Sequence, residues 1–154
     1  GMTLRVLSEP ELAYLKVDIV ISENNSHYKE LKKLTAFRAS TCLHIQVDDM
    51  AAIMVKADLA IGAGGVNTWE RMCLGLPSLV VSFAENHKVL LGDLVKNGYV
   101  NYLGIASDMS DSIIKEGILD ELSKTLVPSE QSNDIFQLVD GLGTGKVAKE
   151  LKYS

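Results

Sequence analysis

The chain has 154 residues, of which 47% are hydrophobic and 23% charged, and its net charge is −5. This composition is typical of a globular domain, and the negative charge argues against nucleic acid as the main partner, because that binding uses clustered Lys and Arg. No apolar run approaches the roughly 20 residues of a membrane helix, and no basic segment with an apolar core opens the chain. We therefore expect a cytoplasmic protein with no membrane span.

Short, nearly all-apolar runs bounded by turn residues predict strands. In chain order they are residues 17–22, 43–47, 58–61, 79–83 and 99–103. Apolar residues at helical spacing predict helices at 4–15, 27–37, 50–56, 66–76, 86–96, 110–126, 130–139 and 145–152. Pro10 interrupts the first helix, Asp48 and Asn86 are candidate N-caps, and Gly98 closes the helix before the last strand.

Strands that alternate with helices predict an α/β fold. We expect residues 1–154 to form one Rossmann-like, three-layer domain, with a parallel sheet covered by helices on both faces. Ligands of such sheets bind beyond the carboxyl ends of the strands, where loops converge. Here those loops comprise residues 23–26, 46–50, 62–68 and 84–87.

The glycine-rich stretch 62–65 joins the third strand directly to a helix. Because glycines let the backbone approach a ligand and the start of a helix favours negative charge, this turn is a candidate phosphate site. Donor side chains of Asn67 and Thr68 in the first helical turn favour that interpretation. The alternative is a tight strand-to-helix turn that binds nothing, since glycine turns without ligands are common.

Known nucleotide-binding patterns fit this turn incompletely. A dinucleotide fingerprint needs glycine at the position of Asn67, so a nicotinamide-dependent oxidoreductase is a weak hypothesis. The stretch also lacks the Gly-Lys-Ser/Thr ending of a Walker loop. A second glycine stretch at 141–146 follows a helix and not a strand, and we interpret it as a helix–helix connection. We predict no cofactor.

Glu70 lies in the same predicted helix and has two interpretations. Either it completes a capping box with Asn67, or its carboxylate accepts hydrogen bonds from two sugar hydroxyls above a bound phosphate. Trp69 has apolar neighbours at helical spacing, so we expect it in the core and not in a stacking platform.

The cysteines and histidines form no recognisable constellation for catalysis or metal binding. Cys42 and Cys73 lack metal-ligand spacing, so we expect reduced thiols in the core and no metal. His44 alternates within a strand pattern and is expected to be structural. His27 and His87 lie near predicted strand-end loops, where we expect surface or capping roles because neither has a paired nucleophile. We predict no catalytic residue within the chain.

Five motifs in order resemble the carboxyl-terminal half of the UDP-sugar hydrolase of pseudaminic acid biosynthesis. They are QVDDM at 46–50, ADLAIGAGG at 57–65, WER at 69–71, GLPS at 75–78 and AEN at 84–86. The same motifs are similar, more distantly, to the peptidoglycan glycosyltransferase that uses UDP-N-acetylglucosamine. The similarity covers about residues 17–104 and is more specific for the superfamily than for one substrate.

The resemblance implies a GT-B arrangement, in which two Rossmann-like halves face each other and the carboxyl-terminal half holds UDP. It implies that backbone groups of Gln46 and Val47 meet the uracil edge, and that Glu70 accepts hydrogen bonds from the ribose hydroxyls. Glu85 and Asn86 would face the sugar. The residues that would surround the diphosphate are Gly64, Gly65, Val66, Asn67 and Thr68.

This sequence departs from the family's pattern in two ways. His87 stands where the family usually has Gln after Glu85 and Asn86. The family's amino-terminal half, with its glycine-rich loop and the histidine assigned to activating water, is not among these residues, nor is the strand that precedes the first helix. Because the opening Gly1-Met2 also resembles the remnant of an expression tag, we expect a fragment of a longer chain.

We therefore predict the UDP-sugar-binding half of a nucleotide-sugar hydrolase or glycosyltransferase-like enzyme of surface-polysaccharide or nonulosonic acid biosynthesis, inactive when alone. Its expected partners are a UDP-sugar and the missing amino-terminal half. The alternative is a non-catalytic module that recognises a nucleotide-sugar or another phosphate ester and is attached to another enzyme of sugar biosynthesis.

Overall fold

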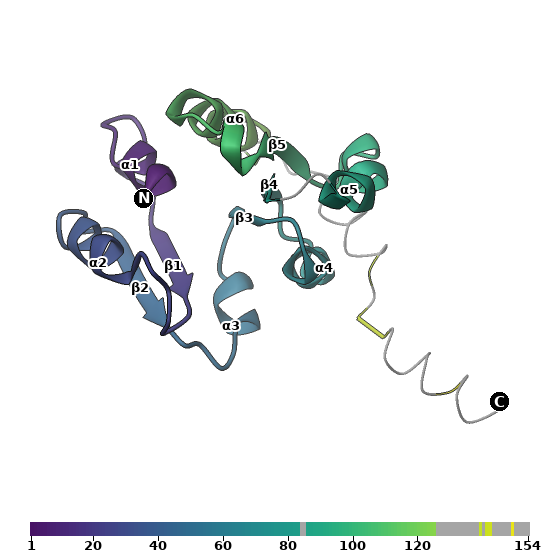
Figure 1. The fold of residues 1–154 in the computed structure, drawn as a ribbon, viewed down its shortest axis with the longest axis horizontal. Coiled ribbons are helices and arrows are strands. Elements are labelled where there is room, and N and C mark those ends of the chain that lie inside the picture. The colour runs from purple at the N-terminus through teal and green to yellow at the C-terminus, as the bar shows by residue number, and fades with distance from the viewer. Residues whose placement is uncertain (84–85, 126–138, 140, 143–148, 150–154) are drawn as a thin grey trace.

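The computed structural model describes residues 1–83, 86–125, 139, 141–142 and 149 (Figure 1). The strands in this part of the chain are β1 (Val17–Ile21), β2 (Thr41–Ile45), β3 (Ala60–Ala63), β4 (Ser78–Ser82) and β5 (Asn101–Ile105). The helices are α1 (Met2–Leu7), α2 (Tyr28–Ala36), α3 (Ala51–Met54), α4 (Val66–Cys73), α5 (Asn86–Lys96), the 3-10 helix η1 (Ala106–Asp108) and α6 (Asp111–Thr125). All predicted strands are confirmed in order. Within the described residues, no helix combines the length and the apolar character that crossing a membrane requires.

Element boundaries differ from the prediction for local reasons. α1 ends at Leu7, and turns replace the expected helix in the stretch around Pro10, whose ring cannot continue a helix. β2 ends earlier than expected because Gln46 takes a left-handed φ of 51°. Met50, and not Asp48, is the N-cap residue of α3, and the carboxylate of Asp49 accepts the N–H of Ala52 at 3.0 Å. The helices expected at 130–139 and 145–152 lie almost entirely outside the described residues.

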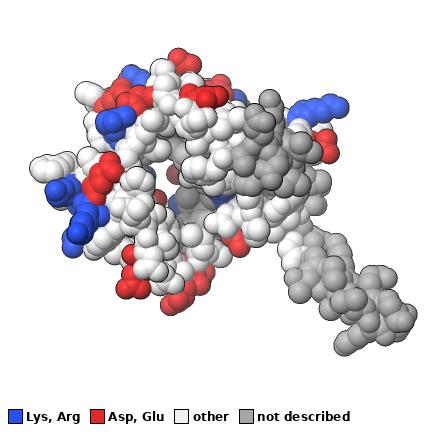
Figure 2. All heavy atoms as spheres, in the orientation of Figure 1, with Lys and Arg blue, Asp and Glu red and all other residues white. Residues whose placement is uncertain are grey.

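The strands are parallel, as expected, and they are divided between two sheets. β1 pairs with β2, and β3, β4 and β5 form a three-stranded sheet in that order. In the described part of the chain, one edge of β1 and one edge of β3 therefore have no neighbouring strand. Figure 2 shows the molecule hollowed near its centre, between the two sheets. The α/β class is confirmed, and the arrangement is consistent with a Rossmann-like fold.

Helices cover both faces of the β3–β4–β5 sheet, so this part of the molecule has three layers (Figure 1). Successive side chains of β4 point to opposite faces. Leu79 faces a cluster with α1 and α6, and Val80 faces a cluster with α4 and α5. The buried residues of the first cluster are Val6, Leu7, Leu12, Leu79, Ile114 and Ile118. Those of the second are Met72, Val80, Leu91, Leu94 and Val100.

Arg38 is 6% exposed and connects the segment after α1 to β2. Its guanidinium donates hydrogen bonds to the hydroxyl of Thr41 and to five backbone carbonyls. Those carbonyls belong to Leu7, Leu12, Ala13, Leu15 and Ser40. Burial lowers the pKa of Arg38, and the carbonyl dipoles compensate for the lost hydration of its charge.

Candidate functional site

The predicted phosphate site lies in the turn between β3 and α4. Two of its N–H groups are already bonded within the protein: Gly64 donates to the carbonyl of Val81 at 2.9 Å, and Gly65 donates to the hydroxyl of Thr68 at 3.2 Å. The N–H groups of Val66 and Asn67, at the start of α4, have no acceptor in the described part of the chain. The donors open to an anion are therefore these two helical amides and not those of the glycines.

Packing accounts for two glycines of this turn and leaves a third unexplained. A Cβ atom on Gly62 would lie 2.4 Å from Nη1 of Arg71, and one on Gly64 would lie 2.7 Å from Cδ1 of Leu91. A Cβ atom on Gly65 would meet no atom of the described chain within 4 Å, and its extended φ of −178° suits any residue. The open space at Gly65 leaves room for a ligand to approach the backbone.

Thr68 and Arg71 hold the turn from the buried side of α4, where they are 1% and 5% exposed. Nη2 of Arg71 donates to the carbonyl of Ala63 and to the hydroxyl of Thr68, both at 3.0 Å. Burial lowers the pKa of Arg71, while the nearby charge of Glu70 opposes that shift. The hydroxyl of Thr68 accepts the bonds from Arg71 and Gly65, so Thr68 shapes the turn. Its direct contact with a diphosphate stays a prediction.

We did not predict from the sequence that Arg71 would hold this turn, although the sequence spacing of Thr68 and Arg71 indicates that their side chains can meet. Thr68 and Arg71 are three residues apart, a spacing at which helical side chains meet. The expectation that Trp69 lies in the core is wrong, because its side chain is 47% exposed. Polar residues occupy the buried face of α4 together with Met72, and Trp69 lies outside that face.

The carboxylate of Glu70 is exposed and makes no hydrogen bond within the described part of the chain, although its charge acts on Arg71. The capping box expected between Asn67 and Glu70 does not form. Instead the N–H of Thr68 donates to the carbonyl of Gly65, and the hydroxyl of Thr68 accepts from the N–H of Gly65. The Glu70 carboxylate therefore remains available as an acceptor for a ligand.

Gln46 and Val47 follow β2, in the other sheet. Gln46 is exposed, and among the non-glycine residues of the described chain it alone has a positive φ. Its N–H donates to the carbonyl of Ile21 at 3.1 Å, which fixes this loop to the end of β1. Strained backbone of this kind is found more often at binding loops than elsewhere, which makes this loop a candidate contact.

The predicted site residues among 64–70 lie together at the start of α4. The other predicted ligand contacts lie elsewhere in the chain, and no hydrogen bond in the described part of the chain connects them to this turn. Glu85 lies outside the described residues, and Asn86 is the first residue of α5. The contacts of Gln46, Val47, Glu85 and Asn86 with a ligand stay predictions.

A side-chain cluster that we did not predict lies on the β1–β2 sheet. Nε2 of His44 is 2.6 Å from a carboxylate oxygen of Asp18, and Cys42 lies beside them. Cys42 is exposed, so the expectation of a buried thiol is wrong at this position, whereas Cys73 is half-buried. The sequence does contain a signal for this cluster: Cys42 and His44 are two residues apart in one predicted strand, so their side chains share a face of the sheet.

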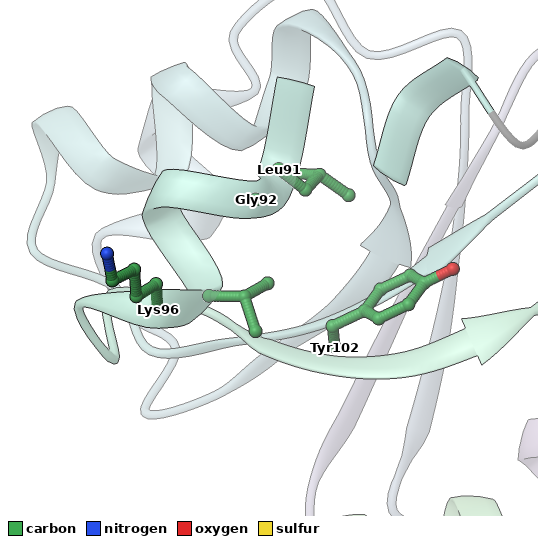
Figure 3. A pocket seen from close by; sticks show the side chains of 5 residues that line it. Leu91, Gly92, Lys96 and Tyr102 are labelled. Atoms are coloured by element: carbon green, nitrogen blue, oxygen red, sulfur yellow. The ribbon is translucent and has the colours of Figure 1, made fainter. Parts of the chain in front are cut away.

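A small cavity of about 210 Å³ lies away from these loops, between α5 and β5. It is lined by Leu91, Gly92, Val95, Lys96 and Tyr102 (Figure 3). Figure 3 shows the ammonium of Lys96 pointing away from Tyr102, so the lining offers little charge to a ligand. Pockets for drug-sized ligands usually reach roughly 300–1,000 Å³, so this cavity is too small for a nucleotide-sugar.

Comparison with known proteins finds one distant similarity to report. No protein-family model matches the chain. Over 105 residues it is 26% identical to the spore coat polysaccharide biosynthesis protein SpsG of Bacillus subtilis (strain 168). The aligned stretch covers 68% of this chain and 31% of SpsG, so the chain corresponds to about a third of that protein.

Proposed function

We propose that the chain is the nucleotide-sugar-binding part of an enzyme of polysaccharide biosynthesis, and that it binds the diphosphate of a UDP-sugar at the start of α4. The observation that carries the proposal is the pair of N–H groups of Val66 and Asn67, which have no acceptor among the described residues and lie beside the open space at Gly65. Amides at a helix start attract anions through their hydrogens and the helix dipole. The similarity to SpsG supports the polysaccharide context.

The carboxylate of Glu70 suits the ribose of the same ligand. A carboxylate accepts hydrogen bonds from two neighbouring hydroxyls, and Glu70 is exposed with no competing bond in the described chain. Glu70 lies one helical turn beyond Val66, in the region where a nucleoside attached to a diphosphate at the helix start would extend. In this proposal Gln46 and Val47 meet the uracil, and Glu85 and Asn86 meet the sugar.

The reaction that fits this ligand is the release of UDP. In a hydrolase, water attacks the anomeric carbon of the sugar, the bond from that carbon to the diphosphate oxygen breaks, and UDP leaves with the electron pair. In a transferase, an acceptor hydroxyl replaces the water. The amides of Val66 and Asn67 would stabilise the charge that develops on the departing diphosphate. The group that activates the water belongs, in this proposal, to a part of the protein outside these residues.

The open edges of the two sheets support the proposal that this chain is one half of a longer protein. A parallel strand between β1 and β3 would join both sheets in the order β2, β1, added strand, β3, β4, β5. α1 would then be the crossover helix between the added strand and β1. Strand order in such a sheet reverses beside β3, and ligands bind at that reversal, next to the turn before α4.

Calorimetric titration of the 154-residue chain with UDP, UMP, CMP and NAD tests the proposed ligand. We expect UDP to bind most tightly and Glu70→Ala to weaken UDP binding about 10-fold, as the loss of one charged hydrogen-bond acceptor would. Glu116→Ala is the matched control, because Glu116 is an exposed carboxylate of α6 with no ion pair in the described chain. Preference for NAD, no UDP binding, or equal loss in both variants would overturn the proposal.

The activity of a longer chain would then distinguish an enzyme from a binding module. We expect a longer chain translated from the same reading frame to release UDP from a UDP-sugar, and Glu70→Ala to slow that release. A longer chain that binds the UDP-sugar and never turns it over would favour the non-catalytic module.

A further inference from the structure

Asp18, Cys42 and His44 share one face of the β1–β2 sheet. In the parallel register Asp18 lies opposite Cys42, and Val20 lies opposite His44. Side chains alternate along a strand, so Cys42 and His44 point to the same face, and Asp18 points to that face from the neighbouring strand. One ligand atom from each residue lies within 4.8 Å of the other two.

Solvent reaches this face. Asp18 and Cys42 are exposed, and the side chains of His44 and Asp18 are 30% and 53% exposed. α2 packs against β2, and the three side chains are not covered by that helix. An ion from solution can therefore reach the cluster without opening the fold.

The three groups form a donor set for a borderline divalent cation. We propose that the thiolate of Cys42, the Nε2 atom of His44 and a carboxylate oxygen of Asp18 bind Zn²⁺, with water as the fourth ligand. Zn²⁺ commonly takes three protein ligands of these kinds and one water in a tetrahedral site. Ca²⁺ and Mg²⁺ prefer oxygen ligands, so the thiolate and imidazole select against them.

Small side-chain rotations are enough to bring the ligand atoms to zinc distances. Metal–ligand bonds of about 2.0–2.3 Å in a tetrahedron separate neighbouring ligand atoms by about 3.3–3.8 Å. The three ligand atoms lie within 4.8 Å of one another, so the thiolate would have to approach the other two by at most about 1.5 Å, and the imidazole and carboxylate, now 2.6 Å apart, would have to separate by about 1 Å. The strand backbones can stay fixed, since the change needs only χ rotations.

The proposed zinc site is separate from the predicted nucleotide site. Asp18 and Cys42 are each the second residue of a strand, whereas the loops 46–50 and 62–68 follow the carboxyl ends of the strands. His44 lies nearer to that end, two residues before Gln46, but its side chain lies on the face of the sheet with Asp18. A bound ion would link β1 to β2 directly, and because it binds the folded chain it would raise stability.

Titration of the 154-residue chain with Co²⁺, a spectroscopic substitute for Zn²⁺, tests the site. We expect visible d–d bands of tetrahedral intensity and a near-ultraviolet thiolate-to-Co²⁺ band, both abolished by added Zn²⁺. Cys42→Ser should remove the thiolate band, and Cys73→Ser, the matched control, should keep it. His44→Gln should weaken Co²⁺ binding at least 10-fold, whereas His27→Gln, which alters another His–carboxylate pair, should leave it unchanged.

Amide resonances of the unmodified chain, recorded with and without Zn²⁺, test the site even if a variant fails to fold. Zn²⁺ should shift the amide resonances of Val17–Ile21 and Thr41–Ile45 and leave those of α4 unmoved. Absence of both the Co²⁺ bands and these shifts would overturn the proposal. It would also fail if the thiolate band survived Cys42→Ser and disappeared with Cys73→Ser.

Discussion

Nη2 of Arg71 lies 3.0 Å from the hydroxyl oxygen of Thr68, and this buried hydrogen bond holds the turn on which the candidate site depends. The same oxygen accepts the N–H of Gly65, so it joins the helix start to the guanidinium. With Gly65 held in this way, the next two amides, of Val66 and Asn67, are the first without an acceptor in the described chain.

Removal of that hydroxyl should loosen the turn. Thr68→Val leaves the N–H of Gly65 and one N–H of Arg71 without acceptors, so we expect a loss of about 1–3 kcal/mol in the free energy of unfolding. Urea unfolding measures this loss. Thr35→Val is the control, because the Thr35 hydroxyl bonds a carbonyl of its own helix at an exposed position and its loss should cost less than about 1 kcal/mol. Equal losses in the two variants would contradict the structural role of Thr68.

Substitution by alanine should affect stability at Gly64 and UDP binding at Gly65. Gly64→Ala puts a methyl group against Leu91 and Val80, so we expect it to destabilise the chain by about 1–3 kcal/mol. Gly65→Ala meets open space, so stability should fall by less than about 1 kcal/mol, while UDP binding weakens about 10-fold or more. Thermal unfolding and calorimetry measure the two effects. UDP binding of normal strength by a folded Gly65→Ala variant would show that no ligand approaches this glycine.

Arg38 should matter more to stability than an exposed arginine. Arg38→Met leaves the buried carbonyls of Leu7 and Leu12 and the part-buried carbonyl of Leu15 without this donor, and we expect it to lower the free energy of unfolding by about 3 kcal/mol. Arg5→Met breaks an exposed ion pair with Asp111, whose loss should cost less than about 1 kcal/mol. Chemical denaturation compares the two variants, and a smaller effect at Arg38 than at Arg5 would contradict the account.

The order and type of the described elements could be predicted from the sequence because apolar runs and breakers are local signals. Side-chain burial could not, since it depends on tertiary contacts. Trp69 was expected in the core, yet hydrogen bonds of Arg71 to neighbouring groups allow a charged residue to occupy the buried face of α4. Cys42 was expected to be buried, yet it lies on the uncovered face of β2.

The division of the strands into two sheets could not be predicted either, because pairing depends on which strands are neighbours in space. Successive N–H groups along a strand point to opposite edges, so one bonded N–H group shows which others point to the open edge. The N–H of Val17 bonds toward β2, so that of Val20 points to the free edge of β1. The N–H of Ala60 bonds toward β4, so that of Ile61 points to the free edge of β3.

Hydrogen exchange should show these open edges. In the 154-residue chain we expect the amides of Val20 and Ile61 to exchange at least about 10-fold faster than those of their neighbours Ile19 and Gly62, which bond within the sheets. A longer chain from the same reading frame should slow exchange at Val20 and Ile61 if it supplies the strand between them. Equal protection of all four amides in the 154-residue chain would contradict the open edges.

Amide resonances measured during a UDP titration show directly whether an anionic diphosphate binds the amides at the start of α4. We expect the resonances of Val66 and Asn67 to shift first and furthest, with smaller shifts at Glu70 and near Gln46, and uridine without phosphate to leave Val66 and Asn67 unmoved. Saturating UDP that shifts only residues around Tyr102, or none at all, would contradict the account.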